Sequence, residues 1–234
     1  MNRHALLFGV LALAVGYAQA ADVEAVSGVN QPTHFEVQHS ILSDAFSADY
    51  HWSVARVFSG LEDTIVKAIV LPSSENEYAL GLKISNDNCE VIYLRSKTSL
   101  YRAQTHGVSV GGQNVSLLEY VRQAEAYPIE VSRRSVEREI CERFGTAWLD
   151  TLERARKQTQ SSLELSTDGT GYFVTAVGRG RALESGWTQS PPAHSDAGIL
   201  VASLEQLVQF ATEPSKTSAD LLVAVESLER FHAR

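Results

Sequence analysis

The chain has 234 residues, with 20 lysines and arginines against 28 aspartates and glutamates, a formal charge of −8 at neutral pH. This acidic balance argues against a nucleic-acid partner, because phosphate contacts need clustered lysine and arginine. The length fits one domain or two small ones and is ample for a buried core.

The first twenty residues have the layout of a cleavable secretory signal. Arg3 lies in a short polar start, residues 5–16 are uncharged and mostly apolar, and Ala18-Gln19-Ala20 offers the small–x–small site that a signal peptidase accepts. The apolar run is about a dozen residues, well short of the roughly 20 that span a bilayer as a helix. We therefore expect cleavage after Ala20, export to a bacterial periplasm, and no stable membrane insertion afterwards.

The rest of the chain, residues 21–234, is expected to form a single mature domain, with residues 21–33 as a loose leader. Removal of Arg3 leaves 19 basic and 28 acidic residues, so the formal charge of this mature chain is −9. Such a charge keeps a protein soluble and permits a basic protein partner without demanding one.

The first half of the mature chain predicts strands. Trp52, Val54, Val57 and Phe58 indicate an edge of the core, and residues 63–71 indicate a short strand or a helical turn. Two apolar, β-prone runs follow, and a turn-forming Ser-Asn-Asp-Asn segment separates them, which predicts a β-hairpin. These two runs are residues 78–84 and 90–94, and the turn is residues 85–88.

Further short elements are expected between this hairpin and the middle of the chain. We predict a more polar strand over residues 100–110, a turn over 111–114, a strand or short helix over 115–125 and a short strand beginning at 128–131.

The strongest helical pattern covers residues 136–157. Apolar residues recur there every four positions, glutamates lie in the first turn and basic residues in the last, as the helix dipole favours. The recurring residues are Val136, Ile140, Phe144, Trp148 and Leu152. Ser135 is the expected N-cap.

The last third predicts a second hairpin and then two helices. The hairpin comprises residues 172–177 and 181–188 around a Gly-Arg-Gly turn. One helix follows Ser195 or Asp196 as its cap and ends before Pro214, and the other opens with a variant capping box over residues 217–220. The whole order predicts an α+β fold, in which antiparallel β-hairpins pack against one central and two C-terminal helices.

Cys89 and Cys141 are expected to form one disulfide, because an isolated cysteine pair in an oxidising compartment usually does; two buried free thiols are the alternative. The bridge would join the central helix to the first hairpin. Neither cysteine belongs to a Cys-x-x-Cys motif, which argues against a redox-active dithiol.

Ser109 is the candidate catalytic residue. Residues 107–111 match the Gly-x-Ser-x-Gly nucleophile elbow, yet that elbow requires a strand before the serine and a helix after it, whereas a turn follows here. His194, Ser195 and Asp196 are adjacent and therefore cannot converge as a catalytic triad, so a helix entry explains them.

His34, His39 and His51 are candidate metal ligands, but their spacings match no usual zinc arrangement. The sequence indicates no cofactor. The Arg133-Arg134 pair is expected to be a solvated end of an element.

Two segments carry a resemblance. One is residues 71–82, with its Pro72-Ser73-Ser74 turn. The other contains Asp168-Gly169, Tyr172-Phe173, Gly186-Trp187 and Ser190-Pro191 before an apolar helix. Together they resemble small exported proteobacterial proteins of unassigned activity. The resemblance implies a periplasmic domain and no catalytic residue.

Three functions remain open from the sequence. The first is a periplasmic protein-binding or inhibitory module, for example an immunity-type protein that neutralises a delivered toxin, with another protein, possibly a basic one, as its partner. The second is a periplasmic serine hydrolase that uses Ser109. The third is an envelope assembly factor, which would expose a large apolar patch. The absence of a convincing catalytic set favours the first, and with it a protein that is not an enzyme.

Overall fold

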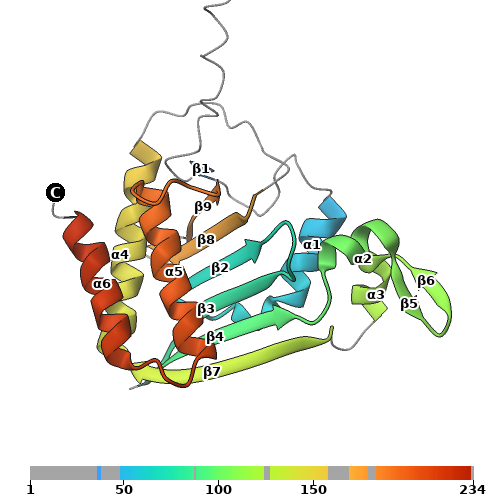
Figure 1. Cartoon of the computed structure of the whole chain (residues 1–234), viewed down its shortest axis with the longest axis horizontal. Coiled ribbons are helices and arrows are strands. Elements are labelled where there is room, and N and C mark those ends of the chain that lie inside the picture. The colour runs from blue at the N-terminus through green and yellow to red at the C-terminus, as the bar shows by residue number, and fades with distance from the viewer. Residues whose placement is uncertain are drawn as a thin grey trace, which may run out of the picture. The chain divides into compact units, whose positions relative to one another are not determined.

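A computed structural model describes residues 36–37, 48–86, 88–123, 127–157, 169–178 and 183–232. The predicted signal peptide, the leader over 21–33, His34 and His39 lie outside these residues. The described part has the predicted α+β fold, in which every neighbouring pair of strands is antiparallel (Figure 1).

The main sheet has seven strands in the order β1-β9-β8-β2-β3-β4-β7. Their bounds are β1 Glu36–Val37, β2 Val66–Leu71, β3 Tyr78–Ser85, β4 Asn88–Ser96, β7 Ile129–Glu137, β8 Gly171–Val177 and β9 Leu183–Gln189. β3 pairs with β4 and β8 with β9, so both predicted hairpins are confirmed. Residues 63–71, for which the sequence allowed either a short strand or a helical turn, contain strand β2, which lies in the middle of the sheet.

Helices cover both faces of this sheet. One face carries α4 (Arg138–Lys157), α5 (Asp196–Thr212) and α6 (Ser218–His232), and the other carries α1 (Ala48–Val57), the 3-10 turn η1 (Ser59–Leu61), α2 (Leu100–His106) and α3 (Leu117–Gln123). In β4, Val91 and Tyr93 belong to the core under α4–α6, whereas Ile92 and Leu94 belong to the core under α1–α3. Burial of both faces explains why this strand is a continuous apolar run rather than an alternating one.

The central helix begins two residues later than predicted. Val136 and Glu137 pair with Cys89 and Asn88 of β4, so they extend β7 rather than open α4, and Ser135 lies in the strand instead of capping the helix. The predicted apolar stripe is otherwise confirmed, because Ile140, Phe144, Trp148 and Leu152 are all buried.

Residues 100–110 are the clearest error of the sequence prediction. They form α2 and only then the short strand β5 (Val108–Val110), which pairs with β6 (Gln113–Val115) in a separate two-stranded sheet. Ser99 caps α2 by accepting a hydrogen bond from the Arg102 amide at 3.2 Å, and Gly107 ends it with a positive φ of 79°.

The caps of the last two helices are confirmed. The Ser195 hydroxyl accepts a hydrogen bond from the Gly198 amide at 3.0 Å, which makes Ser195 the N-cap of α5. At the start of α6, the Asp220 carboxylate accepts hydrogen bonds from the Thr217 amide and hydroxyl at 2.7 and 3.0 Å. Both arrangements satisfy amides or hydroxyls at a helix start.

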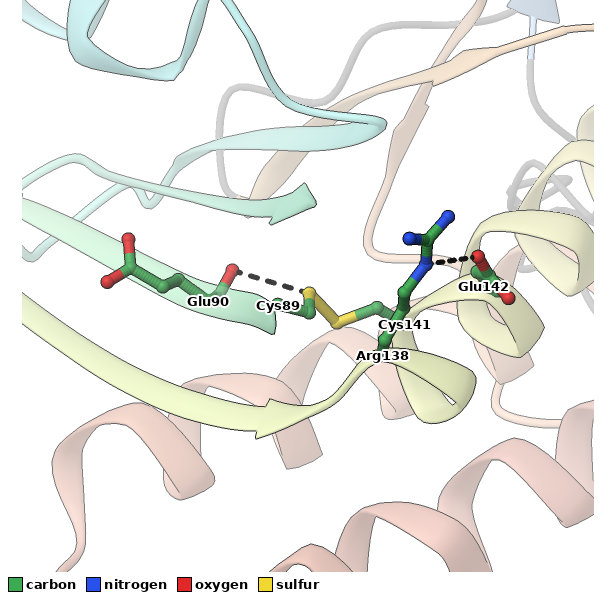
Figure 2. Close-up of a disulfide and its surroundings, with 5 residues drawn as sticks. All are labelled: Cys89, Glu90, Arg138, Cys141 and Glu142. Carbon is green, nitrogen blue, oxygen red and sulfur yellow. Dashed lines mark hydrogen bonds and ion pairs between the residues drawn. A yellow bond between two sulfur atoms is a disulfide. The ribbon is translucent and has the colours of Figure 1, made fainter. Parts of the chain in front are cut away.

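The predicted disulfide is confirmed. Cys89 and Cys141 are bonded and both are fully buried, so the bridge joins β4 to the first turns of α4 (Figure 2). Next to it, Arg138 forms an ion pair with Glu142 at 2.7 Å. Among the described residues, no helix is long and apolar enough to cross a membrane.

Candidate interaction surface

A buried carboxylate, that of Glu77, contacts the layer formed by α1, α2, α3 and the β5–β6 hairpin. Glu77, only 1% exposed, accepts hydrogen bonds from the amides of Leu100 and Tyr101 at 2.7 and 2.8 Å and from the Tyr50 hydroxyl at 3.1 Å. Burial and the nearby Glu77 raise the pKa of Tyr50, which therefore stays a protonated donor. One side chain, directly before β3, thus contacts both α1 and α2.

The β5–β6 hairpin projects from the ends of α2 and α3 (Figure 1). Its two strands are joined by Gly111 and Gly112, whose φ angles of 58° and 83° are those of the tight turn that matches the twist of a hairpin. At its base, Gly107 follows α2, and the Ser116 hydroxyl accepts a hydrogen bond from the Glu119 amide at the start of α3. Both ends of the hairpin are therefore held by capped helices.

Residues 107–118 contain no charged side chain, although a fifth of the chain is charged. Ser109, Val110, Gln113 and Asn114 are exposed, and among the described elements neither strand makes extensive contacts except with the other. An isolated two-stranded hairpin is marginally stable in water. The fold nevertheless holds this one out from the sheet, with its polar and apolar side chains accessible.

Two exposed aromatic residues lie on helices α1 and α2 of the same layer. Trp52 on α1 is 43% exposed and Tyr101 on α2 is 51% exposed. The Arg122 guanidinium of α3 lies over the Trp52 ring, 5.5 Å from its centroid, and Tyr101 makes an edge contact with Tyr50. Tryptophan, tyrosine and arginine are the residues that most often carry the binding energy of protein interfaces.

A hollow of about 500 Å³ opens beside Trp52. Its charged lining residues are Arg56 of α1, Glu62 after η1, and Arg122 of α3. A second hollow, of about 410 Å³, lies between α4 and α6 and has the opposite character. Its charged residues are Glu139, Glu142, Asp150, Glu229 and the single cation Arg143, which pairs with Glu229 at 2.6 Å.

Ser109 lies in β5, opposite Asn114 of β6, and is exposed. The segment after it is a glycine turn followed by another strand, not the helix that a nucleophile elbow requires. The structure thus places the candidate serine at the projecting hairpin.

His51 lies in α1 and is 2% exposed, and desolvation by burial lowers its pKa. His34 and His39 lie outside the described residues, so His51 alone of the three candidate metal ligands can be placed. Among the residues described, no group of three or more histidine, cysteine, aspartate or glutamate side chains could hold a metal ion.

The prediction for Arg134 was wrong. Arg134 does not lie in solvent at the end of an element. Its guanidinium donates hydrogen bonds to the carbonyl oxygens of Phe210, Glu213 and Lys216 at 2.5, 2.9 and 2.9 Å. The same group lies 4.1 Å from the centroid of the Phe210 ring. Its guanidinium therefore caps carbonyl groups at and just beyond the C-terminal end of α5. Its neighbour Arg133 is exposed and pairs with Glu90 at 3.4 Å.

Neither Trp52 nor Tyr101 was recognised from the sequence as part of a site. Trp52 was placed at an edge of the core, and Tyr101 within a strand. The bracketing of residues 100–106 by Ser99 and Gly107, a cap at each end, was the available signal for α2. Comparisons of the chain with protein-family models, with curated proteins and with solved structures find no match.

Proposed function

We propose that the chain is an exported module that binds another protein in the periplasm, as an inhibitory, immunity-type protein does when it neutralises a delivered toxin. The observation that carries the proposal is the uncharged β5–β6 hairpin, which projects from two capped helices (Figure 1), together with the exposed Trp52 and Tyr101 on α1 and α2 of the same layer. A hairpin fixed before binding loses little conformational entropy when a partner closes around it. The exposed aromatic rings add apolar contact area.

Export rests on the signal-like first twenty residues and is supported by the disulfide, which persists in oxidising compartments. The mature N-terminus should be Ala21. N-terminal sequencing of the protein from a periplasmic extract checks this, and a mature protein that still begins at Met1 would contradict export by this route.

Charge supports a basic partner. The mature chain has a formal charge of −9, and four carboxylates line the hollow between α4 and α6. Such a field speeds the encounter with a positively charged protein more than it tightens the complex. In this proposal the acidic surface steers the partner and the hairpin layer makes the specific contact.

The experiment is affinity capture from the native periplasm with two matched variants. Val110 on the hairpin and Val131 on β7 are 45% and 51% exposed, so aspartate at either position should leave the melting temperature within a few degrees of the parent. Val110→Asp should weaken the complex at least about tenfold because it places a charge in the interface. Val131→Asp should not. Equal retention of the partner by all three proteins would exclude the hairpin as the contact.

Ser109→Ala separates binding from hydrolysis at the same hairpin. We expect it to leave partner binding intact, since a neutral hydroxyl at an exposed position adds little. Multiple turnover of a periplasmic substrate by the pure protein, lost in Ser109→Ala at unchanged melting temperature, would establish the hydrolase instead.

A further inference from the structure

Two arginines, Arg56 and Arg122, line the hollow beside Trp52. Within the described part of the chain, Arg56 takes part in no ion pair, and the contact of Arg122 is with the Trp52 ring. Arg95, Arg133, Arg138 and Arg143 all pair with glutamates. Two guanidinium groups without an ion pair among the described residues therefore line the same hollow.

The charge of the hollow is small and positive. Arg56 and Arg122 face one carboxylate, that of Glu62, which also interacts with Lys67 on β2. The lining therefore has a formal charge of +1. A single carboxylate group neutralises it, whereas a phosphate monoester, with close to two negative charges, would overcompensate and meet Glu62.

The tryptophan gives the hollow an apolar side. The Arg122 guanidinium covers part of the Trp52 ring, yet the Trp52 side chain remains 43% exposed. Ala55 and Val121 also line the hollow. A ligand that meets all of these groups carries a carboxylate on an apolar body. The last residue of a polypeptide has both, and capture of a terminal carboxylate is a recurrent mode of peptide recognition.

We propose that the Trp52–Arg56–Arg122 hollow binds the terminal carboxylate of a polypeptide whose last side chain is apolar. The guanidinium forks of Arg56 and Arg122 hold the carboxylate, and Trp52 packs against the apolar side chain. The inference does not require the hairpin to be an interface. It holds or fails independently of the proposed function.

The test uses three small probes on the full mature protein. N-acetylphenylalanine carries the carboxylate and an apolar body, its amide lacks only the charge, and phenyl phosphate replaces the carboxylate with a dianion. Binding is followed at the Trp52 indole N–H resonance, which Trp52→Phe assigns. We expect saturable binding of N-acetylphenylalanine with a Kd on the order of a millimolar, as suits so small a ligand, and much weaker binding of the other two probes.

Arginine-to-alanine variants test whether the carboxylate binds in this hollow. Arg56→Ala and Arg122→Ala should each weaken binding about threefold to tenfold. Arg102→Ala, which removes an exposed arginine of α2, should not change it. Equal binding of the amide, tighter binding of phenyl phosphate, no response at Trp52, or equal weakening in Arg102→Ala would each overturn the proposal. Because all these measurements omit the protein partner, their failure would leave the proposed function standing.

Discussion

Arg134, on strand β7, caps the C-terminal end of helix α5. The last carbonyl groups of a helix have no intrahelical donor, and this arginine on β7 reaches three carbonyls at and beyond the end of α5 while stacking on Phe210. The role depends on the planar fork of arginine, which a lysine cannot reproduce.

Arg134→Ala should lower the free energy of unfolding by about 2 kcal/mol, because it removes charge-assisted hydrogen bonds and a cation–π contact from a half-buried position. Arg134→Lys should recover only part of this. Arg133→Ala is the control, since an exposed ion pair with Glu90 contributes less than about 1 kcal/mol. Urea denaturation measures all three. Equal losses at positions 133 and 134 would show that Arg134 does not act as the cap.

His51 should make the fold sensitive to acid. Burial lowers its folded pKa below the ordinary value near 6.5, so the folded state favours the neutral ring. This contribution to stability is complete above the unfolded pKa and is lost as pH falls from about 6.5 toward the lowered folded pKa. The unfolding free energy should therefore decrease between pH 7.5 and 5.0 with a slope that His51→Gln reduces.

The slope, not the absolute stability, is the measurement, because His51→Gln also perturbs packing in α1. An identical pH dependence in His51→Gln and the parent protein would rule out His51 as the titrating group.

At the scale of elements, the disulfide has the most direct test. Cys89 and Cys141 are 52 positions apart, and closing such a loop restricts the unfolded chain by about 4 kcal/mol in the chain-entropy estimate. Thiol titration of the unfolded, unreduced protein should find no free thiol, and a reductant should lower the urea midpoint. The Cys89→Ala/Cys141→Ala double variant should show no response to the reductant. Two free thiols in the native protein would contradict the bridge.

Glu77 connects the sheet to the projecting hairpin through α2. Glu77→Ala would leave the Leu100 and Tyr101 amides without their acceptor, at a cost of about 3 kcal/mol. Hydrogen exchange should accelerate first at these amides and then through the rest of α2, while β3 and β4 stay protected. Glu77→Gln keeps an acceptor oxygen and should have a smaller effect. Uniform acceleration across the sheet would mean that Glu77 supports the whole fold rather than this layer.

The sequence predicts elements well where local chemistry decides them. The Ser-Asn-Asp-Asn segment that separates β3 from β4 and the caps at Ser195 and Asp220 all act over a few residues. The errors arise where a distant residue decides. Pairing with β4 converts Val136 and Glu137 from expected helix to strand, and Glu77, more than twenty positions away, supports the start of α2.

The candidate site was harder to predict for the same reason. The turn over residues 111–114 was expected, but whether it packs on the sheet or projects from it depends on α2 and α3. Tryptophan is a residue type common in cores, so the sequence places Trp52 there. Only the arrangement of α1 against α3 shows that its ring stays accessible beneath Arg122. Exposed interface residues carry no periodicity of their own, so a single sequence does not separate them from the core.

The last prediction concerns the molecule as a whole and its charge. In the sequence as a whole, 28 aspartates and glutamates outnumber 20 lysines and arginines, and four carboxylates line the α4–α6 hollow, away from the uncharged hairpin. If the proposed partner is basic, long-range attraction accelerates its approach, whereas short-range contacts at the hairpin set how long it stays. The two contributions can be separated kinetically once the partner is purified.

Raising salt from about 0.02 to 0.5 M shortens the Debye length to a few ångströms and should slow association about tenfold or more, with little change in dissociation. The double variant Glu139→Gln/Asp150→Gln should slow association at low salt and converge with the parent at high salt. Val110→Asp should instead speed dissociation. Stopped-flow or surface-based kinetics would resolve these effects. An association rate independent of salt would exclude electrostatic steering, and turnover of a substrate with no stable complex would exclude the binding module itself.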